Sequence, residues 1–164
     1  MTHVIAIDPG YDRLGWAIGT VKPLTVTTYG CIQTSASLPL FERYQHLRTE
    51  LSAVLKQHHP TTAAIETLFF SNNQKTALTV SEARGVIISC LLEHNVRVFE
   101  YGPSQIKLAV TGYGKADKKA VEKMVRLQLK LPATVKEKVL DDTIDALAVL
   151  ITHAYSFTAP GNSV

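Results

Sequence analysis

A short apolar run that ends in a carboxylate and a turn constrains the fold more than any other feature of the chain. Residues 4–7 read Val-Ile-Ala-Ile, and an Asp-Pro-Gly triplet follows at residues 8–10. The run is rich in β-branched residues and too short for a helix, so it predicts a buried strand that the turn ends. Because side chains alternate along a strand, Asp8 shares a face with Val4 and Ala6, where an unpaired charge is costly. We therefore expect a partner to neutralise Asp8, although Asp before Pro-Gly is also a common opener of ordinary turns.

The length and composition are those of a folded domain that is neither disordered nor membrane-spanning. At 164 residues it is most simply one domain, which we expect to span residues 1–157 with a flexible tail at residues 158–164. The chain is 46% hydrophobic and 19% charged, and its apolar segments are too short for a membrane span or a signal peptide, so we expect a cytoplasmic protein. Cys31 and Cys90 lack CxxC spacing and are predicted to be buried thiols. The net charge of +3 fits an anionic partner but decides little alone.

The rest of the chain alternates between patterns typical of strands and of helices. Further strands are predicted at residues 14–18, 24–34, 61–68 and 96–101. Helices are predicted at residues 39–58, 75–94, 103–110, 117–131 and 139–155. Tight connections favour an antiparallel meander for the first three strands, and the helix before the last strand implies a parallel crossover. The sequence therefore predicts an α/β fold with a five-stranded mixed sheet flanked by helices.

The helix predicted at residues 75–94 carries a broad apolar stripe. Its members are Leu78, Ala83, Val86, Ile87, Cys90 and Leu91. Gly85 in the same helix would allow another element to approach closely. Packing on the sheet alone explains such a stripe, and a contact between two copies of the chain is the second interpretation.

Several carboxylates fall where this fold would bring them together. Glu66 ends an apolar strand as Asp8 ends the first one, and parallel neighbouring strands would place both acids at the edge where α/β proteins locate their sites. The last predicted helix adds Asp141, Asp142 and Asp145, and either of the first two can lie beside the third on one face. Each acid also has an ordinary explanation, as a half-exposed loop residue or as a favourable charge at a helix start.

Three or four converging carboxylates would repel one another strongly, and proton sharing or a divalent cation would relieve the repulsion. Oxygen donors without a Cys or His framework favour Mg²⁺ or Mn²⁺ over Zn²⁺. Two such ions, about 4 Å apart, can activate water and stabilise the leaving oxygen in phosphodiester hydrolysis. This chemistry predicts a nucleic acid as the substrate.

A group of basic residues lies between the acidic segments. Three lysines surround a Gly-rich loop: Lys107, Lys115 and Lys118. Four more cations follow on the next predicted helix at a spacing of four, three and four residues: Lys119, Lys123, Arg126 and Lys130. A solvated helix face usually explains one such run, but a stripe beside acids also suits the phosphates of a nucleic acid.

Two aromatic residues and a histidine are further candidates. Phe69 and Phe70 follow Glu66 in a polar loop, where they could stack on bases, or one could close the core, for which Phe70 is the better candidate. His153 is expected to be a cation near the end of the last helix rather than a metal ligand.

With these residues in view, the sequence resembles the RuvC family of bacterial Holliday junction resolvases, nucleases with the ribonuclease H-like fold. The resemblance covers nearly the whole chain and is carried by IDPGYDRLGWAI, AIETLFFSNN, ARGV, VFEY, KLAVTGYGKADKKAVEKMV, LKLP and DDTIDALAVLITH. It implies that the catalytic and metal-binding acids are Asp8, Glu66, Asp142 and Asp145. It also implies that Lys107 and Lys118 contact DNA near the cleaved phosphate and that Phe69 intrudes into the junction.

The resemblance further implies a homodimer that binds a four-way DNA junction during recombination and repair. Such a dimer would make paired, symmetric nicks with Mg²⁺ or Mn²⁺. Its expected partner is a branch-migration motor complex that presents the junction. Tyr11 and Trp16 depart from the commonest residues of the first hairpin. Alternatives are a YqgF-like nuclease acting on RNA or other branched DNA and a non-catalytic junction-binding module. An actin-like ATPase would need two such domains, and this length has room for one.

Overall fold

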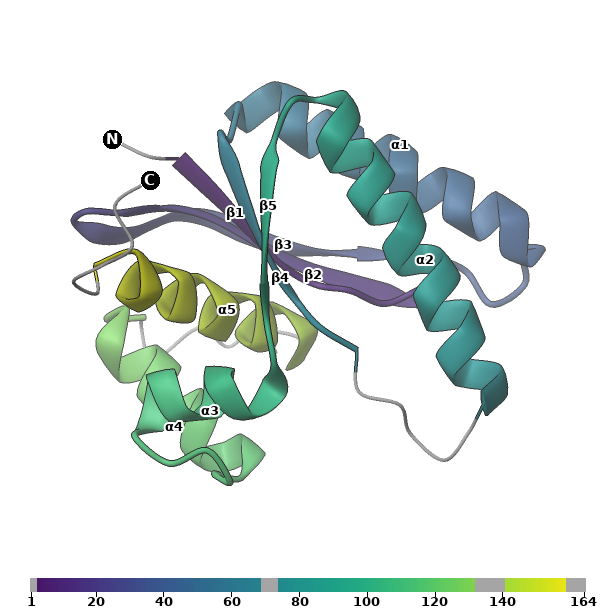
Figure 1. The fold of residues 1–164 in the computed structure, drawn as a ribbon. Helices are drawn as coiled ribbons and strands as arrows, with labels where there is room; N and C mark the ends of the chain where they lie inside the picture. The colour runs from purple at the N-terminus through teal and green to yellow at the C-terminus, as the bar shows by residue number, and fades with distance from the viewer. Residues whose placement is uncertain (1–2, 69–73, 132–140, 159–164) are drawn as a thin grey trace.

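The computed structural model describes residues 3–68, 74–131 and 141–158. In these ranges the chain forms a sheet with helices on both faces (Figure 1). The elements in order are β1 (His3–Asp8), β2 (Arg13–Val21), β3 (Leu24–Gln33), α1 (Leu40–His58), β4 (Thr62–Glu66), α2 (Gln74–Glu93), β5 (Arg97–Tyr101), α3 (Pro103–Thr111), α4 (Lys118–Gln128) and α5 (Asp141–Thr158). No helix in these ranges combines the length and apolar character that a bilayer span requires.

The sheet has the strand order β3-β2-β1-β4-β5. β1, β2 and β3 form an antiparallel meander, whereas β1, β4 and β5 are parallel. The predicted five-stranded mixed sheet is confirmed, including the parallel crossover through α2. Ile7 of β1 lies opposite Ile65 of β4, so the next residues, Asp8 and Glu66, leave the sheet at the same edge.

The two faces of the sheet are covered by different helices. α1 and α2 pack on one face, and α3, α4 and α5 gather on the other (Figure 1). Ile5 and Ile7 of β1 belong to the first core, and Val4 and Ala6 belong to the second. Because side chains alternate along the strand, Asp8 emerges on the α5 side of the sheet.

A glycine on β2 allows the start of α5 to lie directly on the sheet. A Cβ at Gly15 would overlap the carbonyl oxygen of Asp142. Nearby, the Thr143 hydroxyl donates to the Gly30 carbonyl of β3 across 3.3 Å. Glycine inside a strand often marks such a close backbone approach, and here it sets the height of the first turn of α5 above β1 and β2.

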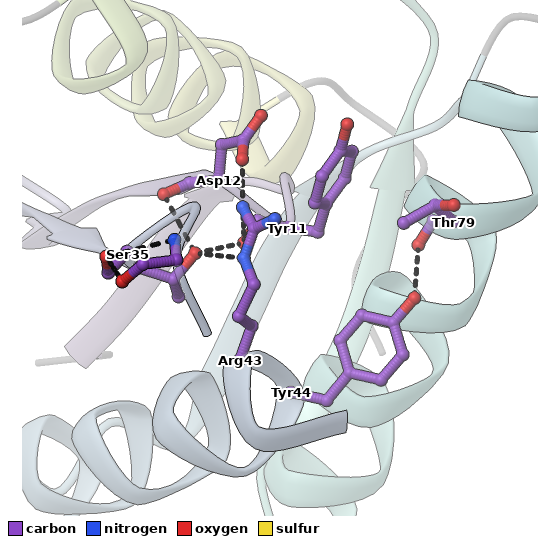
Figure 2. Close-up of polar contacts among 8 residues, drawn as sticks. Tyr11, Asp12, Ser35, Arg43, Tyr44 and Thr79 are labelled. Atoms are coloured by element: carbon purple, nitrogen blue, oxygen red, sulfur yellow. Dashed lines mark hydrogen bonds and ion pairs between the residues drawn. The ribbon is translucent and has the colours of Figure 1, made fainter. Parts of the chain in front are cut away.

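A cluster of polar residues joins the turn between β1 and β2 to helix α1 (Figure 2). The buried Arg43 of α1 donates to the Thr34 hydroxyl across 2.9 Å and to the Tyr11 carbonyl across 3.4 Å, and it pairs with the Asp12 carboxylate. Its guanidinium also lies over the Tyr11 ring, 4.9 Å from the centroid. We call these four residues the Arg43 cluster. It fastens the turn that follows Asp8 to β3 and α1.

The basic helix is shorter than predicted. α4 ends at Gln128, and Lys130 lies beyond it with a left-handed backbone (φ 51°). The Leu131 amide donates back to the Arg126 carbonyl across 3.0 Å, which closes the helix end. The prediction that Lys130 continues the basic spacing on one helix is therefore wrong. At the other end of the chain, α5 runs to Thr158, and residues 159–164 of the predicted tail lie outside the described ranges.

His153 is a core residue rather than the predicted helix-end cation. Its side chain is fully buried, and its Nδ1 lies 2.7 Å from the Tyr101 hydroxyl. The rings of Phe99 and Phe157 contact it as well. Burial lowers the pKa of His153 to about 4, so the ring is neutral at pH 7. The prediction was wrong because the apolar face of α5 continues past this position. Cys90 is buried as predicted, whereas Cys31 is only partly buried.

Candidate active site

Carboxylates from three distant segments meet at the edge of the sheet where β1 and β4 end. Asp8 comes from β1, Glu66 from β4, and Asp142 and Asp145 from the first turns of α5. Burial raises the pKa of Asp8 to about 8, and the charges of Asp145, Glu66 and Asp142 add to the effect. We call these four residues the carboxylate cluster. Its members are close enough to oppose one another's ionisation.

The pKa values of two further acids of the cluster, Glu66 and Asp145, are shifted in the same direction. Burial raises the pKa of Glu66 to about 7, with Asp145 contributing and Lys107 opposing. Burial also raises the pKa of Asp145, and Lys118 opposes that shift. The neighbouring cations therefore do not fully offset the burial and mutual repulsion of these acids, and the cluster favours binding of further positive charge.

The structure separates the roles of two adjacent aspartates at the start of α5. Asp142 Oδ2 lies 3.1 Å from Arg13 Nε, and its side chain is 21% exposed. Asp141 Oδ2 lies 3.3 Å from Lys118 Nζ, and its side chain is 71% exposed. Asp142 is also among the charges that raise the pKa of Asp8, whereas Asp141 acts on Asp145, whose pKa both aspartates raise. Asp142 therefore faces the cluster, and Asp141 lies at its rim.

A cavity of about 290 Å³ opens beside the acids between β4, α3, α4 and α5. Asp117 caps α4 by accepting the Ala120 amide across 2.8 Å, so Lys118 begins the helix at the mouth of this cavity. Lys118 Nζ lies 3.6 Å from Asp145 Oδ2. The lining combines acids, lysines and apolar side chains: Glu66, Pro103, Ile106, Lys107, Lys118, Val121, Asp145 and Ala148.

The remaining predicted DNA-binding residues lie outside this cavity. Lys119 and Lys123 are exposed on α4, and Lys115 is exposed in the loop before it. Arg126 pairs with Glu122 across 2.9 Å, which leaves it less available to a phosphate. Phe69, like Phe70, falls outside the described residues. Of the predicted basic residues, the structure thus brings Lys107 and Lys118 to the carboxylate cluster.

The donor set of the cluster suits a hard cation. It offers only carboxylate oxygens, the ligands that Mg²⁺ and Mn²⁺ prefer. Asp142 Oδ2 is buried and has no hydrogen bond from any described residue. As the side chains stand, no three His, Cys, Asp or Glu residues within the described ranges are close enough to hold one metal ion. Arg13 and Lys118 occupy Asp142 and Asp145 through ion pairs instead.

Sequence reasoning missed two residues that shape the site. Gly15 did leave a signal, because a glycine inside a strand pattern marks a close backbone approach. Arg13 left none, because its position opposite Asp142 depends on how α5 lies on β2, and no local pattern contains that information.

Comparison with known proteins gives the same conclusion as the resemblance. Residues 4–153 match the sequence profile of the family described as "Crossover junction endodeoxyribonuclease RuvC". The chain belongs to the RuvC family. The RuvC protein of Roseiflexus sp. (strain RS-1) is 46% identical over 157 residues, which cover 94% of this chain and 92% of that protein. The RuvC protein of Caldicellulosiruptor saccharolyticus is 45% identical, with coverage of 94% and 93%.

A solved RuvC structure also matches in three dimensions. The structure of Thermus thermophilus RuvC in complex with a Holliday junction substrate superposes with a TM-score of 0.83 at 32% sequence identity. The match covers 95% of this chain and 94% of that chain. These matches support the predicted fold and favour RuvC over the YqgF-like alternative.

Proposed function

We propose that this chain resolves four-way DNA junctions by hydrolysing one phosphodiester bond in each of two strands, during recombination and repair. The observation that carries the proposal is the carboxylate cluster at the ends of β1 and β4, beside Lys107 and Lys118, in a chain of the RuvC family. The Thermus thermophilus relative was solved with a Holliday junction substrate, which supports the same substrate class here.

The carboxylate cluster would hold the divalent cations of the reaction. Asp8, Glu66, Asp142 and Asp145 supply the oxygen donors, and we propose Mg²⁺ or Mn²⁺, two per site. When bound, these ions would activate water and stabilise the leaving oxygen. For Asp142 and Asp145 to bind them, the ion pairs with Arg13 and Lys118 must open.

Basic side chains would guide the DNA toward the acids. Lys107 and Lys118 line the cavity next to Glu66 and Asp145, so they can bind the phosphates that flank the cleaved bond. Farther from the acids, the DNA would contact the exposed or partly exposed cations of α4 and of the loop before it: Lys115, Lys119, Lys123 and Arg126. We propose that Phe69 stacks on a base at the junction.

Paired nicks require two active sites, which a homodimer would supply. One face of α2 is exposed and consists of small side chains between two leucines: Leu78, Ser81, Gly85, Ser89 and Leu92. The leucines are 67% and 59% exposed, and a Cβ at Gly85 would meet nothing within 4 Å. Such a face suits close packing against the same helix of a second copy. We further propose a cytoplasmic protein with one domain over residues 1–157 and a branch-migration motor complex as its partner.

The decisive experiment is cleavage of a four-way junction in which each strand is labelled in turn. With Mg²⁺ or Mn²⁺ we expect paired nicks at symmetric positions, and Asp8→Asn should bind the junction without cutting it. Glu50→Gln, which removes an exposed carboxylate from α1, is the matched control and should cut normally.

Parallel reactions with duplex DNA and RNA test the alternatives. Equal cleavage of all three substrates would indicate a general ribonuclease H-like nuclease. Junction binding without metal-dependent turnover would indicate a binding module, and absence of paired nicks with both metals would overturn the proposed function.

A further inference from the structure

Arg13 stands on the other side of the carboxylate cluster from Lys107 and Lys118. It begins β2, whereas Lys107 follows β5 on α3, and β2 and β5 flank the β1–β4 pair that carries Asp8 and Glu66. Arg13 is also absent from the residues that line the cavity of the two lysines. Cations therefore lie on both sides of the acids along the strand order: Arg13 on the β2 side, and Lys107 and Lys118 on the β5 side.

The contact between Arg13 and Asp142 can be exchanged for another. Nε and Oδ2 lie 3.1 Å apart, yet this oxygen forms no hydrogen bond with any described residue, so charge attraction holds the pair together. The Arg13 side chain is 50% exposed, which leaves part of the guanidinium reachable from solvent. A guanidinium has five donors in a planar fork and binds carboxylates and phosphates equally well in geometry.

We propose that Arg13 is a positioning residue that couples cation binding to DNA binding. It holds Asp142 until a divalent cation takes the carboxylate, and its guanidinium then binds a phosphate of the strand that is cut. That strand passes between Arg13 on one side and Lys107 and Lys118 on the other. The inference rests on the proposed function, because it needs both the cation and the DNA.

The first test titrates Mn²⁺ into the protein without DNA and measures the affinity by calorimetry. Arg13→Gln removes a charge that competes with the cation for Asp142, so Mn²⁺ should bind about three- to tenfold more tightly. Arg13→Lys keeps the charge and should bind Mn²⁺ like the wild type. Lys22→Gln removes an exposed charge at the far end of the β2–β3 hairpin and is the matched control, with unchanged binding expected.

The second test measures the binding of a fluorescent four-way junction in Ca²⁺ over a series of salt concentrations. Loss of one phosphate contact in Arg13→Gln should lower the slope of log K against log salt by about one, and Lys22→Gln should keep the wild-type slope. If Arg13→Gln binds Mn²⁺ or the junction as the wild type does, the inference is overturned. The proposed function still stands in that case, provided that the wild-type protein cuts junctions. A wild-type protein that neither binds nor cuts junctions would overturn both.

Discussion

Two polar clusters lie on opposite sides of the turn that follows Asp8, and they treat charge in opposite ways. In the Arg43 cluster one buried cation meets a carboxylate, a hydroxyl, a carbonyl and an aromatic face. In the carboxylate cluster four acids gather, and burial together with their mutual repulsion raises the pKa of Asp8 to about 8. Balanced charge supports the fold, whereas collected like charge costs stability and marks a site that serves a reaction.

The largest expected effect is on cutting by Asp8→Asn. The substitution keeps the size of the side chain and removes the charge most strongly opposed by its neighbours, so the rate of junction cleavage should fall by about a thousandfold or more. Single-turnover cleavage with Mg²⁺ measures the loss. A rate within tenfold of the wild type would show that Asp8 is not part of the reacting centre.

The two aspartates at the start of α5 should differ clearly. Asp142→Asn should lower cleavage by about tenfold to a hundredfold, because Asp142 faces Asp8. Asp141→Asn should change cleavage by less than about threefold, because Asp141 lies at the rim with Lys118. Side-by-side cleavage assays measure both, and the reverse ranking would contradict the arrangement described above.

The Arg43 cluster should affect stability rather than chemistry. Arg43→Met keeps much of the volume but loses the hydrogen bonds and the ion pair, so the free energy of unfolding should fall by about 2 kcal/mol. Arg48→Met on the same helix breaks a half-exposed pair with Glu93 and should cost less than about 0.5 kcal/mol. Urea unfolding measures both, and cleavage per folded molecule should stay near the wild-type rate. Equal costs for the two substitutions would remove the structural role assigned to Arg43.

The carboxylate cluster should make stability depend on pH in the unusual direction. The folded pKa values of Asp8 and Glu66, about 8 and about 7, lie above their ordinary values of 3.8 and 4.5. Between about pH 4 and pH 8 the folded chain thus binds more protons than the unfolded chain, and the contribution of these acids to stability is lost as pH rises. In EDTA, the advantage of Asp8→Asn over the wild type should grow between about pH 4 and pH 8, by several kcal/mol, on the order of 5 for a shift of about four pKa units. An advantage that is constant across this window would contradict the raised pKa.

Much of the fold could be predicted because its signals are local. The apolar runs that end at Asp8 and Glu66 show where two strands stop, and helical spacing shows most of α1 to α5. Strand alternation then places Asp8 on one face before any tertiary contact is known. The acids therefore follow from sequence as a group.

What sequence could not supply depends on packing between distant segments. The spacing of α5 left Asp141 and Asp142 equivalent, and the family resemblance alone pointed to Asp142. In the structure, the position of the helix over β2 and β1 separates the two side chains. The same packing buries His153, which local charge rules predicted as a cation. Arg13 enters the site because β2 lies beneath the first turn of α5.

Thermal unfolding at about pH 8, with and without Mn²⁺, tests the central claim most directly, namely that the carboxylate cluster collects negative charge for a divalent cation to neutralise. The cation binds the folded chain and relieves the repulsion, so Mn²⁺ should raise the unfolding temperature of the wild type and raise that of Asp8→Asn much less. Equal shifts for the two proteins, or no shift for the wild type, would contradict the account.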